Sequence, residues 1–283
     1  MTAPATRRIN AGNGHWYKMD GEKVDGVTTV IGNGIPKPAL VGWAAKAIAE
    51  YVGERLEIDP DKGTVGADNL VASLAKVGAN NRYNKWPDSG APSRLAIIET
   101  LKGVHYADRD KAARRGTEVH GLGERLVNGE EITVPDELVG HVDAYLKFLA
   151  DWDVQPELVE VVVGNRTHRW MGTLDLIATL NDGQRWLLDI KTTRSGIYGE
   201  TALQLAAYRN AEFYLDADDV EHPMPAVDAV GAIWVRADGY DLIPVHAEAE
   251  TYRMFRYAQQ VAKFTTELGK SWVLPALMCE VAA

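Results

Sequence analysis

Two strand-like segments of the sequence place acidic and basic side chains among apolar ones. Asp175 ends a Gly-Thr-Leu-Asp sequence, and Asp189 and Lys191 lie two residues apart in the segment that follows it along the chain. Side chains two residues apart on a strand share one face, so Asp189 and Lys191 are expected to point the same way while their apolar neighbours pack. Asp175 belongs to the preceding strand of a short hairpin, where it can stand beside Asp189.

These residue types indicate a particular chemistry. Two carboxylates and an ammonium on a buried sheet face are costly unless they have a purpose. Converging carboxylates suit a hard divalent cation such as Mg²⁺, which would polarise a phosphate oxygen and lower the pKa of a bound water. Lys191 would orient or deprotonate that water, or stabilise charge in the transition state. The alternative is an ordinary exposed Asp/Lys pair on an edge strand, because Asp-x-Lys often arises by chance.

Three further polar residues are candidates for the same site. Gln204 and Tyr208 are four residues apart on a predicted helix, so they share a face and can both reach a phosphate or the catalytic groups. They fit the polar edge of an amphipathic helix equally well. His120, shortly after Thr117, is either a metal ligand, a phosphate contact or a structural histidine, and Thr117 could simply cap a helix.

The charge pattern bears on nucleic-acid binding. The formal charge of −10 counts mildly against a DNA-binding protein, so charge segregation is expected. Residues 80–115 are the best candidate for a nucleic-acid contact path, and a solvated helix face is the alternative. The basic residues of this segment are Arg82, Lys85, Arg94, Lys102, Arg109, Lys111, Arg114 and Arg115, interleaved with Tyr83, Trp86 and Tyr106.

Periodicity predicts the elements that must position these residues. The first 110 residues are expected to hold a hairpin with an Asp20-Gly21 turn, an extended segment at 27–31, a helix near 38–55, a short helix within 60–80 and a less regular stretch from 80. Beyond residue 116, helices are predicted at 117–128, 136–152, 199–215 and 248–268, and strands at 158–163, 170–180, 185–192, 229–236 and 240–245. This order predicts an α/β sheet with helices on both faces, in which the helix 199–215 forms a right-handed crossover.

Composition excludes several other classes. The single cysteine, Cys279, rules out an internal disulfide and a cysteine-ligated iron–sulfur cluster. No apolar leader or membrane span is evident, so a cytoplasmic protein without membrane contact is expected. A zinc hydrolase would require clustered ligands, whereas His105, His120, His141 and His168 are scattered.

Four short motifs occur in a fixed order and together resemble a known family. They are Gly116-Thr117-x-x-His120, Gly172-x-x-Asp175, Asp189-x-Lys191 and Gln204-x-x-x-Tyr208. This series resembles the RecB-like branch of the PD-(D/E)XK nuclease superfamily, which includes phage exonucleases and exonucleases of CRISPR adaptation. The resemblance implies a restriction-endonuclease-like core at 111–283, with a central mixed sheet flanked by helices. It also implies an N-terminal hairpin-plus-helix extension at 1–110 that contacts DNA.

The resemblance also implies roles for individual residues. His120, Asp175, Asp189 and the Ile190 carbonyl would bind Mg²⁺ or Mn²⁺, and Lys191 would be catalytic. Gln204 and Tyr208 would position the DNA end or the active-site groups, and Glu160 would be an accessory acid. Many CRISPR-associated relatives hold an iron–sulfur cluster through four cysteines, which this chain lacks.

The expected activity is that of a DNA exonuclease in phage or bacterial recombination, replication or repair, with a possible recombination or helicase partner. Two alternatives stay open at this point. One is a structure- or sequence-specific endonuclease of the same fold, and the other is a non-catalytic DNA-binding module that retains the fold.

Overall fold

The chain forms two compact units, described from a computed structural model. The sheet unit comprises residues 1–36 and 116–283, and the helical unit comprises residues 37–115. Within them the structure describes residues 5–11, 14–79, 92–127, 130 and 132–276. The predicted boundary at residue 110 grouped the N-terminal hairpin with the helical extension. The hairpin belongs instead to the sheet unit, because its last strand hydrogen-bonds to the central sheet.

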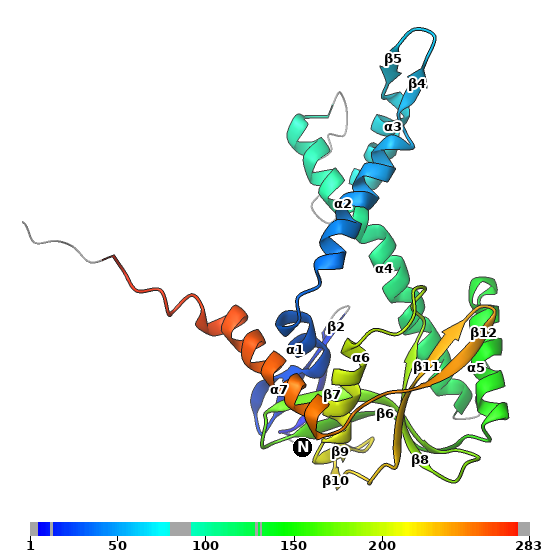
Figure 1. The fold of residues 1–283 in the computed structure, drawn as a ribbon, viewed down its shortest axis with the longest axis vertical. Helices are drawn as coiled ribbons and strands as arrows, with labels where there is room; N and C mark the ends of the chain where they lie inside the picture. Colours follow the sequence, from blue (N-terminus) through cyan, green and yellow to red (C-terminus); the bar gives the residue numbers. More distant parts are fainter. Residues whose placement is uncertain (1–4, 12–13, 80–91, 128–129, 131, 277–283) are drawn as a thin grey trace, which may run out of the picture. The chain divides into compact units, whose positions relative to one another are not determined.

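A ten-stranded mixed sheet is the frame of the sheet unit (Figure 1). Its strands are β1 (Arg7–Ala11), β2 (Gly14–Met19), β3 (Glu22–Gly26), β6 (Gln155–Asn165), β7 (Trp170–Thr179), β8 (Arg185–Lys191), β9 (Phe213–Leu215), β10 (Glu221–Pro223), β11 (Ala229–Arg236) and β12 (Gly239–Pro244). One path runs β1-β2-β3-β7-β6-β9-β10, and β8, β11 and β12 continue from β7. β11 pairs with β8 in parallel, as the predicted crossover requires, and most other pairs are antiparallel.

Helices cover both faces of this sheet. They are α1 (Val27–Gly34), the part of α4 (Arg94–Val127) that follows Arg115, η1 (Asp136–Leu138), α5 (Val139–Asp151), α6 (Glu200–Arg209), α7 (Ala249–Lys263) and the π-helical turn η2 (Phe264–Leu268). On one face, α1, α6 and α7 bury a core that includes Leu205 and Phe255 against Leu187. On the other face, Phe148 of α5 packs against Leu188. The predicted α/β architecture with helices on both faces is therefore confirmed.

The sheet splits along one edge of β7. β6 pairs with β7 along nearly its whole length and so occupies one edge. The other edge is shared: β3 pairs only with Trp170 and Met171, and β8 begins to pair at Leu176. Among the described strands, none pairs with residues 172–175 on that edge. The missing ladder leaves an opening in the sheet at the Gly-Thr-Leu-Asp sequence.

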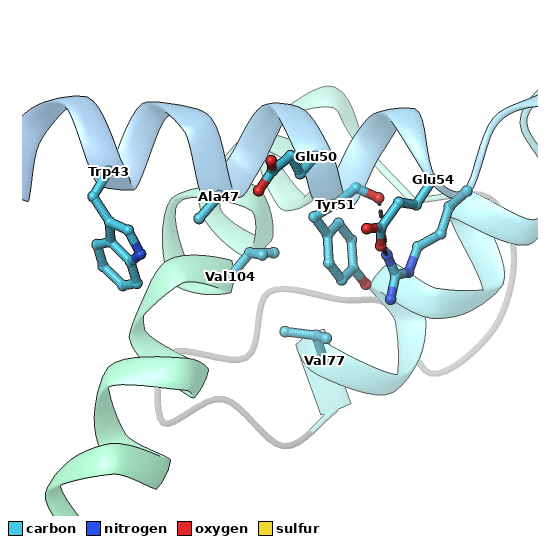
Figure 2. A pocket seen from close by; sticks show the side chains of 8 residues that line it. Trp43, Ala47, Glu50, Tyr51, Glu54, Val77 and Val104 are labelled. Atoms are coloured by element: carbon cyan, nitrogen blue, oxygen red, sulfur yellow. Dashed lines mark hydrogen bonds and ion pairs between the residues drawn. The ribbon is translucent and has the colours of Figure 1, made fainter. Parts of the chain in front are cut away.

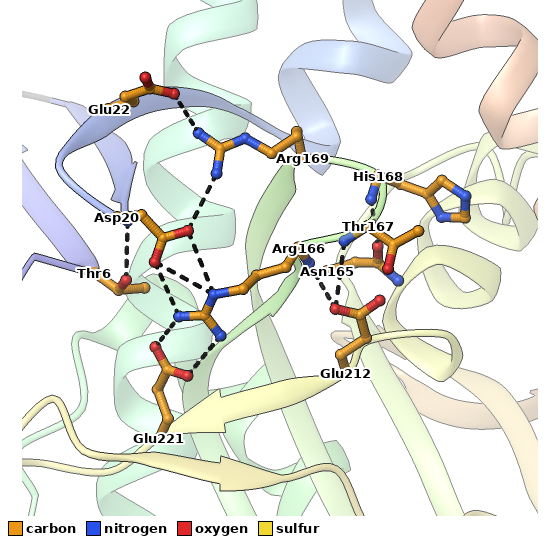
Figure 3. Close-up of polar contacts among 10 residues, drawn as sticks. All are labelled: Thr6, Asp20, Glu22, Asn165, Arg166, Thr167, His168, Arg169, Glu212 and Glu221. Atoms are coloured by element: carbon orange, nitrogen blue, oxygen red, sulfur yellow. Dashed lines mark hydrogen bonds and ion pairs between the residues drawn. The ribbon is translucent and has the colours of Figure 1, made fainter.

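The N-terminal hairpin is attached to the core by a network of ion pairs (Figure 3). Its turn is the predicted Asp20-Gly21, with both residues at positive φ, as a tight two-residue hairpin turn requires. Arg166, just after β6, donates to Asp20 at 3.1 Å and to Glu221 of β10 at 2.7 Å. Arg169 donates to Asp20 at 3.2 Å and to Glu22 at 2.7 Å. One guanidinium therefore links the hairpin turn to the opposite end of the sheet path.

In its described residues, the helical unit is built from three helical segments and a small hairpin. Its elements are α2 (Pro38–Gly53), β4 (Glu57–Asp59), β5 (Thr64–Gly66), α3 (Asp68–Ala79) and the part of α4 up to Arg115. Side chains from all three helices enclose a pocket of about 340 Å³, lined by Trp43 and Tyr51 of α2, Val77 of α3 and Val104 of α4 (Figure 2). The Arg55 Cζ lies 3.9 Å from the Tyr51 ring centroid, and Arg55 also lines this pocket.

Three predicted elements were wrong. Residues 27–31 were predicted to be extended but form α1, because Val27, Val30, Ile31 and Gly34 make one buried helical face. Residues 94–115 were predicted to be irregular but lie within the 34-residue α4. Four consecutive charged residues at 108–111 interrupt the apolar periodicity by which a helix would be recognised in the sequence. Thr117 consequently lies inside a helix and is not its N-cap.

The third error concerns the helix predicted at 199–215, which ends at Arg209. The Asn210 side chain turns back to donate to the Ala206 carbonyl at 2.8 Å, and the chain leaves the helix there. Phe213 and Leu215 then form β9 against β6. No helix among the described residues is long and apolar enough to cross a membrane.

Candidate functional site

The opening in the sheet leads into a polar pocket of about 980 Å³ that lies wholly within the sheet unit. Four acidic residues line it: Glu124, Glu160, Asp175 and Asp189. Lys191, His120 and Arg8 line it as well and supply basic groups. Every residue singled out from the four motifs for its side-chain chemistry therefore reaches one cavity, although the motifs span almost a hundred residues of sequence.

Asp175 occupies the position where the ladder between β7 and β8 is interrupted. Its Oδ2 accepts a hydrogen bond of 2.7 Å from the Ile190 amide, so a carboxylate takes the place of a strand carbonyl. The alternation of β7 also breaks here, because Leu174 and Leu176 pack into opposite cores although they are two residues apart. The carboxylate is held by backbone, which fixes it more firmly than a flexible side-chain partner would.

Asp189, Lys191 and Gln204 form a compact polar cluster beside Asp175. The Lys191 Nζ lies 2.6 Å from Asp189 Oδ2 and donates to Gln204 Oε1 at 3.2 Å. Gln204 Nε2 in turn donates to Asp189 Oδ1 at 2.8 Å. The predicted shared face of Asp189 and Lys191 is thus observed, and the helix α6 supplies the amide that joins them.

His120 connects α4 to the two strands of the site. Its Nε2 lies 2.7 Å from the Ile190 carbonyl oxygen. Its Nδ1 lies 3.4 Å from Asp175 Oδ2 and 3.6 Å from Glu160 Oε1. His120 and the Ile190 carbonyl were both expected to face a cation, but here they bond to each other, because a carbonyl needs a donor and the imidazole provides one.

Glu160 lies opposite Asp175 on the neighbouring strand β6. Its φ of 51° is in the left-handed region, which is uncommon for a residue other than glycine, and the β6–β7 register passes over this pair. The irregular backbone brings the Glu160 carboxylate close to His120. The sequence suggested only an accessory role for Glu160, and it carries no spacing signal that would have placed it so near the centre.

Burial and charge determine the protonation of this cluster. Burial raises the pKa of Asp175 to about 7, and Asp189 adds to the effect, while His120 opposes it. Burial lowers the pKa of His120, but the surrounding carboxylates, Asp175 first, outweigh burial and raise it to about 9. Burial also lowers the pKa of Lys191, but Asp189 and Asp175 together outweigh burial and leave the pKa above the ordinary lysine value. Lys191 is therefore a cation at neutral pH, which favours charge stabilisation over the role of a base.

The donor set fits a divalent cation. His120, Glu160 and Asp175 offer one nitrogen and two carboxylate oxygens, and these atoms all lie within 4.8 Å of one another. Oxygen-rich sets with one imidazole suit Mg²⁺ or Mn²⁺. Asp189 is turned toward Lys191 and Gln204 and lies outside this group of three, although it shares the pocket.

Tyr208 lines the polar pocket but is almost wholly buried. It is buried, and burial raises its pKa well above the ordinary tyrosine value, with the Gln204 side chain acting in the opposite direction. A Cβ placed on Gly172 would lie 2.5 Å from the Tyr208 ring. The glycine of the Gly-x-x-Asp motif therefore leaves room for the tyrosine of the Gln-x-x-x-Tyr motif, and the pair packs α6 against β7.

The N-terminal hairpin forms another wall of the pocket. Arg8 of β1, His15 and Tyr17 of β2 line it, together with Thr28 at the start of α1. None of these residues was predicted from the sequence to belong to the site. Their only signal was the alternation of the hairpin, which shows that they share a face but not what that face meets.

The basic segment at 80–115 is described only in part. Arg82, Tyr83, Lys85 and Trp86 lie outside the described residues, as do the side chains of Arg109 and Lys111. Among the described basic residues of this segment on α4, Arg94, Lys102 and Arg114 are exposed and Arg115 is half-buried, and Tyr106 is exposed as well. They belong to the helical unit, whereas the polar pocket belongs to the sheet unit.

Comparison with known proteins adds little to this geometry. No protein-family model matches the chain, and no curated protein matches its sequence. A search of solved structures finds the crystal structure of SSO0001, which is 13% identical over 55% of this chain and 73% of that one, with a TM-score of 0.28. A similarity of this size supports no argument about fold or function.

Proposed function

We propose that this protein is a metal-dependent nuclease of the RecB-like PD-(D/E)XK kind, hydrolysing phosphodiester bonds in DNA as an exonuclease. One observation carries the proposal. Asp175, Asp189 and Lys191 come from two strands that diverge at that point, and they open into one pocket with His120. Carboxylates, an ammonium and an imidazole around an opening of this size suit phosphodiester chemistry assisted by a cation.

The cation would be held by residues already close together. Asp175 and His120 would be its ligands, with Asp189, the Ile190 carbonyl and Glu160 as the further candidates. A bound Mg²⁺ or Mn²⁺ would supply Lewis acidity toward a phosphate oxygen. Without a cation, the four acidic residues of the pocket would repel a phosphate, so binding of substrate and binding of metal are expected to depend on each other.

The chain's own side chains would then divide the remaining work. Lys191 is a cation held 2.6 Å from Asp189, and its ammonium can stabilise negative charge that develops on the phosphate. Gln204 bonds to both Asp189 and Lys191 and fixes their relative position. Tyr208 supports Gln204 from the buried side of α6, which makes it a positioning residue that does not contact DNA.

The test is hydrolysis by the purified full chain on linear single-stranded, linear double-stranded and closed circular DNA. Release of nucleotides from linear DNA with Mg²⁺ or Mn²⁺, none with EDTA, and loss of activity in Asp189→Asn are expected. Asp151→Asn is the matched control, because that exposed carboxylate pairs with Lys147 and Tyr240 on α5 and β12.

Each other outcome has a definite meaning. Cleavage of closed circular DNA would indicate an endonuclease of the same chemistry and not an exonuclease. DNA binding in EDTA with no turnover in any metal would indicate a non-catalytic module. Hydrolysis that survives in Asp189→Asn would refute the assignment of the active site to this pocket.

A further inference from the structure

A line of four polar side chains runs from the N-terminal hairpin to the strand that carries Asp175. Arg8 Nη2 lies 3.3 Å from His15 Nδ1, and His15 Nε2 lies 3.1 Å from the Tyr17 hydroxyl. The Tyr17 hydroxyl lies 3.0 Å from Thr173 Oγ1. The β1–β2 register places Arg8 directly opposite Tyr17, with His15 two residues away on the same face. All four residues line the polar pocket.

Because Arg8 can only donate, it sets the donor-to-acceptor direction of every hydrogen bond in this line. A guanidinium can only donate, so His15 Nδ1 must accept from Arg8. Burial, aided by Arg8, lowers the pKa of His15, and the neutral ring then carries its proton on Nε2 and donates it to the Tyr17 oxygen. Tyr17 is neutral because burial raises its pKa, so its own proton goes to Thr173 Oγ1. The Thr173 hydroxyl proton is left for another acceptor.

Nothing in the described part of the chain accepts that proton. Tyr17 is the only described side chain that hydrogen-bonds to the Thr173 hydroxyl. Thr173 lies two residues before Asp175, in the part of β7 that has no strand partner on its open edge. The acceptor of that proton therefore lies in the pocket, as water or as a ligand of the site.

The line is also held rigidly. Tyr17 is 4% exposed, and it packs with Met19 and Met171 where the hairpin meets the sheet. A Cβ on Gly26 would lie 3.0 Å from its ring, so the glycine at the end of β3 leaves the space that the ring occupies. Because the ring cannot swing away, the hydroxyl of Tyr17 remains directed at Thr173.

We propose that the hairpin holds Thr173 as a hydrogen-bond donor to an anionic phosphate oxygen of the nucleic acid bound in the pocket. This inference rests on the proposed function and extends it to the recognition of substrate. Thr173 is the contacting residue, and Arg8, His15 and Tyr17 are positioning residues. A contact of this type positions the phosphodiester backbone without reading a base, so it predicts no sequence preference.

The test measures kcat and KM for DNA hydrolysis in Thr173→Val, Thr173→Ser, Tyr17→Phe and the double variant Tyr17→Phe/Thr173→Val. Thr173→Val removes the hydroxyl at constant shape and should lower kcat/KM roughly tenfold or more, the range for a hydrogen bond to a charged group. Thr173→Ser keeps the donor and should retain activity. Tyr17→Phe should cost less, and it should cost nothing further in the Thr173→Val background.

A second measurement tests the direction independently of activity. Long-range ¹⁵N–¹H NMR of the histidine rings should show His15 protonated on Nε2, and Tyr17→Phe should shift that signal. Protonation on Nδ1, additive losses in the double variant, or unchanged kcat/KM in Thr173→Val would each overturn the proposal. A merely structural role would lower thermal stability without the non-additive loss of kcat/KM.

Failure of the proposed function would look different. A wild-type chain with no hydrolysis in any metal would refute the nuclease, and binding of a fluorescein-labelled oligonucleotide in Ca²⁺ would then test the phosphate contact. Weaker binding by Thr173→Val than by Thr173→Ser would support the contact in that case. Equal binding by both variants would overturn it.

Discussion

The sheet unit and the helical unit differ in both core and charge. In the sheet unit, large side chains such as Trp170, Phe148 and Phe255 are fully buried in clusters on both faces. In the described part of the helical unit only Leu74, Ala96 and Thr100 are buried. Residues 37–115 carry 13 Lys or Arg against 10 Asp or Glu, a formal charge of +3, while the rest of the chain carries 17 against 30, a formal charge of −13.

This difference separates two requirements of the proposed nuclease. Carboxylates that must hold a position within fractions of an ångström lie on a well-packed sheet, where neighbouring side chains prevent rearrangement. The basic residues lie in a region with few buried apolar contacts, which is typical of segments that open locally. We infer that the sheet unit performs the chemistry and that the helical unit contributes attraction to DNA, and variants in each unit test this division.

The largest expected effect is on stability. Leu188→Ala removes a fully buried side chain from the sheet unit and should lower its free energy of unfolding by about 2–5 kcal/mol. Leu74→Ala in the helical unit should increase amide exchange in α3 and leave β7 and β8 unchanged. Hydrogen exchange read by mass spectrometry measures both. If Leu74→Ala also accelerated exchange in β7, the two units would unfold together and the comparison would fail.

The next effect is on the rate of hydrolysis. Lys191→Ala removes the ammonium beside Asp189 and should lower kcat by roughly two to three orders of magnitude, as expected for loss of a preorganised charge. Single-turnover cleavage with saturating Mg²⁺ is the measurement. Lys147→Ala is the matched control, since its exposed ammonium pairs with Asp151 on α5. Equal kcat values in the two variants would show that Lys191 takes no part in the mechanism.

A smaller effect is the pH dependence of metal stabilisation. The folded pKa values of Asp175 (about 7) and His120 (about 9) are both raised, so the metal-free fold binds protons more tightly than the unfolded chain. The stability of the metal-free fold therefore falls as pH rises through about 7 and then about 9, because these two groups lose their protons. A bound cation would supply the positive charge that the protons no longer provide. Stabilisation by Mg²⁺ should increase from pH 6 to pH 9, by about 1.4 kcal/mol per pH unit for each proton displaced.

Thermal unfolding with and without Mg²⁺ at several pH values measures this trend. His222→Asn should leave the trend unchanged, because His222 pairs with Asp216, and neither residue lines the polar pocket. A stabilisation by Mg²⁺ that is the same at pH 6 and pH 9 would mean that the cation displaces neither proton.

The smallest effect concerns the basic side chains of α4. Substituting Arg94, Lys102 and Arg114 singly by alanine should weaken DNA binding a few-fold, and the salt slope of the binding constant should fall by about one for each phosphate that the protein no longer neutralises. Fluorescence anisotropy across a salt series measures the slope, and kcat should not change. A changed kcat with an unchanged slope would place these residues in the chemistry and contradict the division between the units.

The sequence predicted the chemistry-bearing strands well because their spacing is a direct consequence of strand geometry. Asp189 and Lys191 share a face by alternation alone, and the hairpin between β7 and β8 places Asp175 next to them. The helix at 27–34 was missed because β-branched residues favour strands. Burial of Val27, Val30 and Ile31 on one helical face, with α1 packed against α7, stabilises the helix instead.

Contacts between distant segments could not be predicted from local pattern. The bond between His120 and the Ile190 carbonyl joins residues 70 positions apart, and it depends on how α4 approaches the sheet. The left-handed backbone of Glu160 and the reach of Tyr17 to Thr173 also arise from packing. The extent of the pocket and the position of the hairpin in its wall depend on the whole sheet. No single motif encodes either of them.

The arginine that ties the hairpin turn to β10 has a consequence for how the protein responds to ionic strength. Arg166 and Arg169 are partly exposed, so mobile ions weaken their hold on Asp20 and Glu22. Added salt would then act at two places, on the attraction between protein and polyanion and on the fastening of the wall that bears Arg8 and His15. A charge-neutral tether in place of the Arg166 and Asp20 pair would weaken the second sensitivity, while the Arg169 and Glu22 pair would keep part of it.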